Sequence, residues 1–226
     1  MNKCWICCEK EANSREHVIK SSNLNMVFGN IVHESPIFTH RNGRNRKLNS
    51  KNNINAKFEL SICQRCNDTL TQPHDLSWDK LSRFLLENEA LLRRKRRLNL
   101  SECFGDKVKT NVLNCRLFLA KILGCMICES NNDFFMSDLA HSIRENDEIS
   151  NLHFSINIVD SIKVNDYCEL SHLEVIENGN IPIWASFIYL LNGVAIKVVY
   201  CVDNGLVKSK MIGPYHDSLY TYIDKI

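Results

Sequence analysis

Apolar residues recur at helical spacing in three parts of this chain and form short strand-like runs near its C-terminus. The pattern predicts helices over about Leu76–Arg97, Thr110–Cys128 and Ser137–Arg144. Asp75 precedes the first of them, where a carboxylate can accept the free amide hydrogens of the first turn. We therefore expect a helical middle section with a carboxylate cap at its start.

β-Branched and aromatic residues dominate four C-terminal segments, which predicts strands over His153–Val159, Tyr167–Ile176, Trp184–Leu191 and Val194–Val202. Asn192–Gly193 separates the last two, and this pair is typical of a tight β-hairpin. We expect a small antiparallel sheet. The hairpin should offer an edge strand to a second copy of the chain or to a regulatory protein.

The N-terminal part has weaker patterns. Ser14–Ile19 and Phe58–Ile62 are typical of short strands, and the Asn-rich stretch Ser21–Asn55 is expected to be a loop. The apolar pattern breaks around Leu98–Lys109. These boundaries predict an α+β protein with two domains, residues 1–100 and residues 110–226.

The composition is that of a globular protein: 44% of the residues are hydrophobic and 24% are charged, which excludes a mainly disordered chain. The longest apolar run, near Ile181–Ile188, is shorter than the roughly 20 residues of a membrane span. With no apolar leader segment, we expect a cytoplasmic protein that contacts no membrane. Its 11 cysteines should be thiols or metal ligands.

Charge is divided unevenly along the chain. Residues 1–110 hold 20 Lys and Arg against 12 Asp and Glu, a net charge of +8, and the remainder holds 8 against 14, a net charge of −6. The basic half is expected to meet a polyanion, although each basic stretch is equally typical of a solvated surface. The residues expected to contact nucleic acid are Arg41, Arg44, Arg46, Lys47, Lys51, Arg93, Arg94 and Arg96.

Four cysteines form two pairs, Cys4 with Cys7 and Cys63 with Cys66, and two residues separate the members of each pair. This spacing lets two thiolates from one turn face one cation, and two such turns complete a tetrahedral zinc shell. A closed four-sulfur site is structural, so the sequence predicts a structural Zn²⁺. The alternative is two unrelated pairs of buried thiols.

Two more features lie beside this predicted zinc clasp: Glu16 and His17 follow the first pair, and Asn67 directly follows Cys66. In this order, the motifs resemble the zinc-clasped HNH (His-Asn-His) endonucleases over about residues 1–80. The resemblance implies a ββα-metal finger, extended here by a long helix. It also implies that His17 is the general base and that Glu16 and Asn67 hold a catalytic Mg²⁺ or Mn²⁺. The chemistry of these groups agrees, since histidine titrates near neutral pH and carboxylate and amide oxygens suit hard cations.

The chain departs from the family pattern in three places. The acid is Glu16 where Asp is common, and no context singles out the middle Asn among Asn45, Asn49, Asn52, Asn53 and Asn55. The third departure is that no histidine is clearly the third one of the family pattern. His74 is a candidate for an extra ligand or phosphate contact, although a histidine in a polar loop is more often solvated.

From these features we expect a metal-dependent endonuclease that hydrolyses DNA, with RNA not excluded, in a setting such as bacterial defence or restriction. One alternative is a non-catalytic zinc module that binds nucleic acid. The other is a toxin or effector nuclease controlled by a partner on the acidic C-terminal domain.

Overall fold

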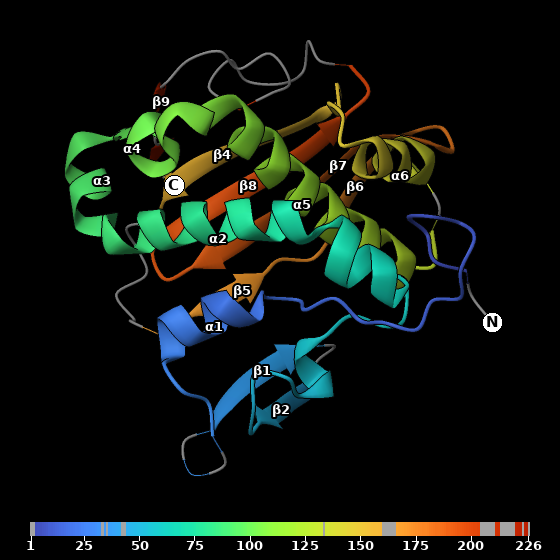
Figure 1. The fold of residues 1–226 in the computed structure, drawn as a ribbon, viewed down its shortest axis with the longest axis horizontal. Helices are drawn as coiled ribbons and strands as arrows, with labels where there is room; N and C mark the ends of the chain where they lie inside the picture. The colour runs from blue at the N-terminus through green and yellow to red at the C-terminus, as the bar shows by residue number, and fades with distance from the viewer. Residues whose placement is uncertain are drawn as a thin grey trace.

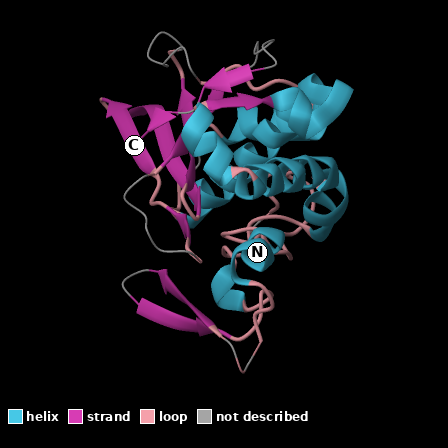
Figure 2. Ribbon diagram, turned by 90° about the vertical axis from the view of Figure 1, so that its left-hand side faces the viewer, coloured by secondary structure: helices cyan, strands magenta, loops and turns pink. Residues whose placement is uncertain are grey.

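A layer of helices packs against one face of an antiparallel sheet, as the computed structural model shows from two directions (Figures 1 and 2). It describes residues 3–32, 34, 36–41, 44–132, 134–159, 166–203, 211–212, 220–222 and 224–225. The helices are α1 (Ser21–Phe28), α2 (Gln72–Glu87), α3 (Glu89–Lys95), α4 (Leu100–Phe104), α5 (Val108–Glu129) and α6 (Met136–Glu145). Short helical turns are η1 (Ile54–Ala56), η2 (Cys66–Leu70) and η3 (Gly105–Lys107).

The sheet is built from strands of the C-terminal part in the order β10-β4-β8-β7-β5, and β6 pairs with β7 beside β5. These strands are β4 (Leu152–Ile158), β5 (Cys168–Leu170), β6 (Glu174–Asn178), β7 (Ile181–Leu191), β8 (Val194–Cys201) and β10 (Asp224–Lys225). All of their pairings are antiparallel except that of β10 with β4. The predicted antiparallel sheet is therefore confirmed.

The β7–β8 hairpin turns at Asn192 and Gly193 as predicted, with Leu191 paired to Val194. Asn192 has a φ of 48°, a left-handed conformation that Asn adopts more readily than most other non-glycine residues. The expectation that this hairpin forms a free edge is wrong, because β8 pairs with β4 and β7 pairs with β5 and β6. Its backbone groups are already used within the sheet.

The predicted helix Leu76–Arg97 is two helices, because α2 ends at Glu87 and α3 begins at Glu89. Between them, the Asn88 side chain donates to the Phe84 carbonyl at 2.9 Å, a local bond that competes with the helix. Asp75 lies inside the first turn of α2 rather than capping it.

The stretch expected to be a loop contains α1 and a separate hairpin, β1 (Ile37–Arg41) with β2 (Arg44–Leu48). Figure 2 shows this hairpin extending away from the two layers. Four of the five β2 residues are exposed, so the strand has no apolar alternation to reveal it. Backbone pairing with β1 and the burial of Leu48 at its end make it a strand.

One cluster of buried apolar side chains runs from Cys4 to Ile212 and draws on both predicted domains. At its centre, Trp78 of α2 stacks on Phe118 of α5 at 4.7 Å and meets Tyr189 of β7 edge-on at 5.2 Å. Strand β3 (Arg97–Asn99) also pairs with β9 (Tyr220–Tyr222). The two predicted parts therefore share a core, and the segment between them carries β3 and α4.

Helix α5 is buried along most of its length, and its buried side chains are apolar except for those of Asn111, Asn114, Arg116 and Lys121. The segment Leu100–Glu129 is long and apolar enough to cross a membrane, but 89% of its most apolar window is buried in the structure. This burial is typical of a core helix. The sequence predicts this helix over Thr110–Cys128, but the run near Ile181–Ile188 is not the longest apolar segment of the chain.

Candidate functional site

The sulfur atoms of Cys4, Cys7, Cys63 and Cys66 all lie within 4.8 Å of one another. Sulfurs placed about 2.3 Å from a tetrahedral zinc would lie about 3.8 Å apart. The Sγ atoms of Cys7 and Cys63 are 3.9 Å apart. The four cysteines could therefore hold a metal ion such as zinc, as their spacing predicts.

Local backbone geometry shapes the first half of this cluster. Cys4 donates its amide to the Lys10 carbonyl at 2.8 Å, and Cys8 donates to the Cys4 carbonyl at 2.8 Å with a φ of 57°. This tight turn brings Cys4 and Cys7 to one side. Cys63 and Cys66 lie where the chain passes from an extended segment into the π-helical turn η2.

The thiols differ in acidity. Burial raises the pKa of Cys4 and of Cys66. Burial acts in the same direction on Cys7, but bonds from the Lys10 and Glu9 amides outweigh it and lower the pKa of the Cys7 thiol to about 7. Burial therefore favours the protonated thiols of Cys4 and Cys66, and ligation by all four cysteines would need a metal ion that stabilises their thiolates.

A pocket of about 460 Å³ contains the three residues expected to be catalytic, Glu16, His17 and Asn67. Glu16 and His17 lie on an extended segment that pairs through isolated bridges, Ser14 with Ile62 and His17 with Lys57. Asn67 follows Cys66 on η2. The segments that carry the cysteine pairs thus also carry the residues of this pocket.

The His17 ring is held by the backbone of the chain. Its Nε2 lies 3.1 Å from the Lys51 carbonyl oxygen, and because a carbonyl only accepts, Nε2 donates and Nδ1 keeps its lone pair. Burial lowers the pKa of His17; the Glu16 carboxylate opposes this, and the nearby Lys57 adds to it. His17 is therefore neutral near pH 7 and able to accept a proton.

None of Asn45, Asn49, Asn52, Asn53 and Asn55 lines this pocket. The group that orients His17 among the described residues is the Lys51 carbonyl. A backbone oxygen can take this role at any residue type, so the sequence carries no signal for it.

Asn67 is fixed through its amide nitrogen, which donates to Ser14 Oγ at 3.0 Å. Because the nitrogen is engaged there, the side-chain oxygen is the atom that Asn67 can offer to a cation.

Glu16 is 6% exposed, and both of its carboxylate oxygens have partners. Oε2 pairs with Lys121 Nζ at 2.8 Å, and Oε1 accepts the His17 amide at 3.1 Å. A carboxylate has about four lone-pair positions, so it can still reach a cation. Its first role in this structure is nevertheless as the partner of a buried lysine.

Sequence reasoning missed Lys121, a residue of α5 with no exposed side-chain surface. Besides Glu16, its ammonium contacts both oxygens of Asp75, at 3.0 and 3.1 Å, and Thr71 Oγ1 at 3.2 Å. Asp75 also pairs with Lys20 at 3.3 Å. The available signal was a lone lysine within the apolar run of α5, since such a charge is buried only with partners.

His74 lies elsewhere. It is 1% exposed, and its Nε2 lies 3.1 Å from Asn146 Oδ1 at the end of α6. Burial lowers the pKa of His74. It does not line the pocket, so the structure places it in the core rather than in a polar loop or at a cation.

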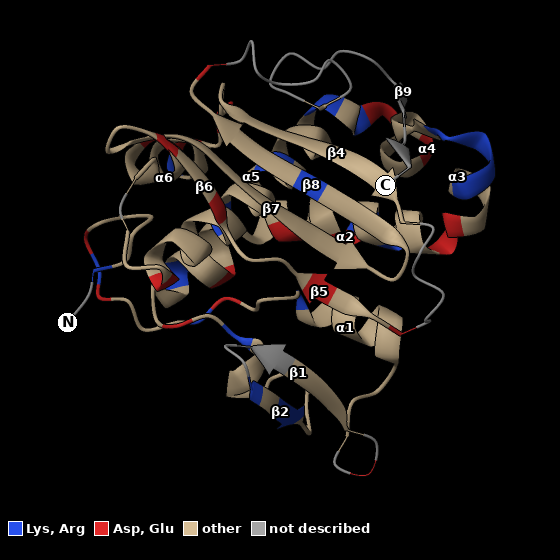
Figure 3. Ribbon diagram, turned by 180° about the vertical axis from the view of Figure 1, so that it is seen from behind, with Lys and Arg blue, Asp and Glu red and all other residues tan. Residues whose placement is uncertain are grey.

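The basic residues expected to bind nucleic acid lie in two places, which Figure 3 shows apart on α3 and on β2. Arg93 pairs with Glu89 at 2.7 Å and donates to the Val159 carbonyl at 3.2 Å, so it helps to hold α3 against the sheet. Arg94 is exposed and Arg96 is partly buried. On β2, Arg44, Arg46 and Lys47 are exposed, and Lys51, in the turn after β2, is half-buried. Arg41 of β1 is described only in its backbone.

No family model, curated protein or solved structure matched this chain in the three comparisons with known proteins.

Proposed function

We propose that this chain is a zinc-stabilised, metal-dependent endonuclease that hydrolyses DNA phosphodiester bonds, as the HNH endonucleases it resembles do. The observation that carries the proposal is the pocket shared by a neutral His17, Asn67 and Glu16 beside four clustered cysteines. The closed sulfur cluster would hold the structural zinc, which leaves the chemistry to the pocket.

In this mechanism, Nδ1 of His17 accepts a proton from a water molecule as the water oxygen attacks phosphorus. The new P–O bond forms as the bond to the 3′ oxygen breaks, and the leaving oxygen takes a proton from solvent. A Mg²⁺ or Mn²⁺ ion held by Asn67 and Glu16 would supply Lewis-acid stabilisation of the phosphate charge. General base catalysis by His17 would contribute about 10²–10⁴ in rate.

Nicking of supercoiled plasmid with Mg²⁺, with Mn²⁺ and with EDTA tests the proposal. Wild type should nick only with a divalent cation, and His17→Ala should be slower by about 10²–10⁴. His141→Ala is the matched control, because His141 is an exposed residue of α6. Nicking by His17→Ala at the wild-type rate would remove the proposed base.

Asn67→Ala tests the cation ligand separately. Its activity should fall and should recover in part at high Mg²⁺ or with Mn²⁺, because a lost ligand weakens cation affinity without removing the base. Zinc content should stay at the wild-type level, since Asn67 supplies no sulfur.

One observation favours a second candidate, a non-catalytic zinc module that binds nucleic acid. The pairing of Glu16 with Lys121 gives this carboxylate a structural reason to be present. A protein that binds DNA and leaves plasmid intact with either cation would establish that alternative.

A further inference from the structure

A second pocket, of about 190 Å³, lies next to the first and shares two residues with it, Arg15 and Lys57. His17 and Lys57 are bridge partners, and directly opposed residues of an antiparallel pair project to the same face. Arg15 is two positions before His17 in the same extended segment, so it lies on that face too. The two pockets are therefore neighbours across a shared wall of two cations.

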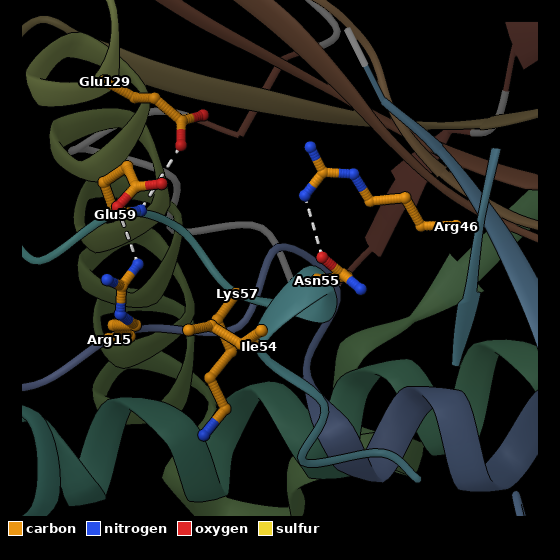
Figure 4. Close-up of a pocket in the computed structure, with 7 residues that line it drawn as sticks. All are labelled: Arg15, Arg46, Ile54, Asn55, Lys57, Glu59 and Glu129. Carbon is orange, nitrogen blue, oxygen red and sulfur yellow. Dashed lines mark hydrogen bonds and ion pairs between the residues drawn. The ribbon is translucent and has the colours of Figure 1, made fainter. Parts of the chain in front are cut away.

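Both carboxylates of the second pocket lie on one side of it, together with Arg15, as Figure 4 shows. On one side, Arg15 pairs with Glu59 at 2.8 Å, and Glu129 accepts the Glu59 amide at 3.3 Å. On the other side, Arg46 donates to Asn55 Oδ1 at 2.8 Å. Lys57 lies between the two sides. The carboxylates are thus confined to one wall, and the opposite wall offers guanidinium and amide groups.

The β1–β2 hairpin extends this basic wall. In β2, residues two apart share a face, so Arg44 and Arg46 lie on the same face as the buried Leu48. Arg46 of this face lines the second pocket. A phosphate backbone leaving the first pocket would pass Lys57, then Arg46, then Arg44.

We propose that the second pocket is a phosphate subsite in which Arg46, Asn55 and Lys57 bind the DNA strand beside the phosphate that reacts at His17. This rests on the proposed function for the identity of the reacting strand. Guanidinium and ammonium groups contact phosphate oxygens without reading bases, so the subsite positions the strand and carries no sequence preference. Cleavage would accordingly require a polymer that reaches both pockets.

The double variant Arg46→Gln/Lys57→Gln tests the subsite. Binding of a fluorescein-labelled DNA duplex is followed by anisotropy, without added divalent cation, between about 50 and 200 mM salt. Losing two phosphate contacts should make the plot of log binding constant against log salt concentration less steep by about 1.8. Wild type should therefore lose about tenfold more affinity than the variant over this range. The control Lys80→Gln/Lys197→Gln removes the same charge from exposed residues of α2 and β8 and should keep the wild-type slope.

A slope for Arg46→Gln/Lys57→Gln equal to that of the control would overturn the subsite. Plasmid nicking by wild type is measured in parallel. A reduced slope together with intact plasmid supports the subsite and rejects the nuclease, whereas nicked plasmid with an unchanged slope rejects the subsite alone.

Discussion

Replacing Lys121 with Met removes a fully buried ammonium from between two carboxylates. Met has similar length and an adaptable side chain, so packing is largely kept. Asp75 keeps Lys20 at 3.3 Å as a partner. Of the two contacts described for its carboxylate, Glu16 keeps only the one with the His17 amide. The cost of the substitution therefore falls mainly on Glu16.

Breaking a buried ion pair from one side costs about 3–5 kcal/mol, because the remaining charge stays buried without compensation. For a chain of 226 residues, each kcal/mol lowers Tm by about 2–4 °C, which predicts a fall of about 6–20 °C. Burial by itself lowers the pKa of Lys121, but Glu16 and Asp75 outweigh it and raise the pKa above the ordinary lysine value. The stabilisation from Lys121 is thus fully present below the unfolded-state pKa of about 10.4 and is lost only as pH rises through the folded-state pKa.

Urea unfolding followed by tryptophan fluorescence measures this loss, because Trp78 is fully buried. Lys80→Met is the control, since Lys80 is exposed on α2 and its loss should change the free energy of unfolding by less than about 0.5 kcal/mol. In the double variant Glu16→Gln/Lys121→Met, the cost should be smaller than the sum of the two single costs, because neither charge remains. A Lys121→Met variant as stable as Lys80→Met would refute the reasoning.

Three further outcomes are expected. Cys63→Ser should lose zinc by elemental analysis and become partly unfolded, because metal binding and folding are one equilibrium, whereas Cys103→Ser, outside the cluster, should keep its zinc. Gly124→Ala should lower stability by about 1–3 kcal/mol in thermal unfolding, since a Cβ there would overlap the Trp5 ring, and Gly124→Ala/Trp5→Phe should recover part of the loss. Because the pKa of His17 is lowered, its neutral form persists as pH falls, and kcat/KM for nicking should decline only below about pH 6.5. A decline in kcat/KM that begins above this pH would contradict the prediction.

The sequence by itself determined the features that depend on a few neighbouring residues. Two residues between cysteines are enough to turn a pair of thiols to one side, and the four sulfurs do meet within 4.8 Å. Asn192–Gly193 is enough to reverse a strand. Within each pair and in the hairpin the cause is the local backbone, so the spacing predicts these turns without knowledge of the rest of the fold. The approach of one cysteine pair to the other, as between Cys7 and Cys63, depends on tertiary packing.

Only the tertiary structure decided what surrounds these features. Asp75 looks like a helix cap along the chain, yet it pairs with Lys121 because α2 packs on α5. His74 looks solvated, yet the end of α6 covers it. Strand β2 shows no apolar alternation, because it is held by backbone pairing with β1 and only its last residue, Leu48, is buried. Such partners are brought together by packing between distant segments, and no spacing within one segment encodes which charge will be buried beside which.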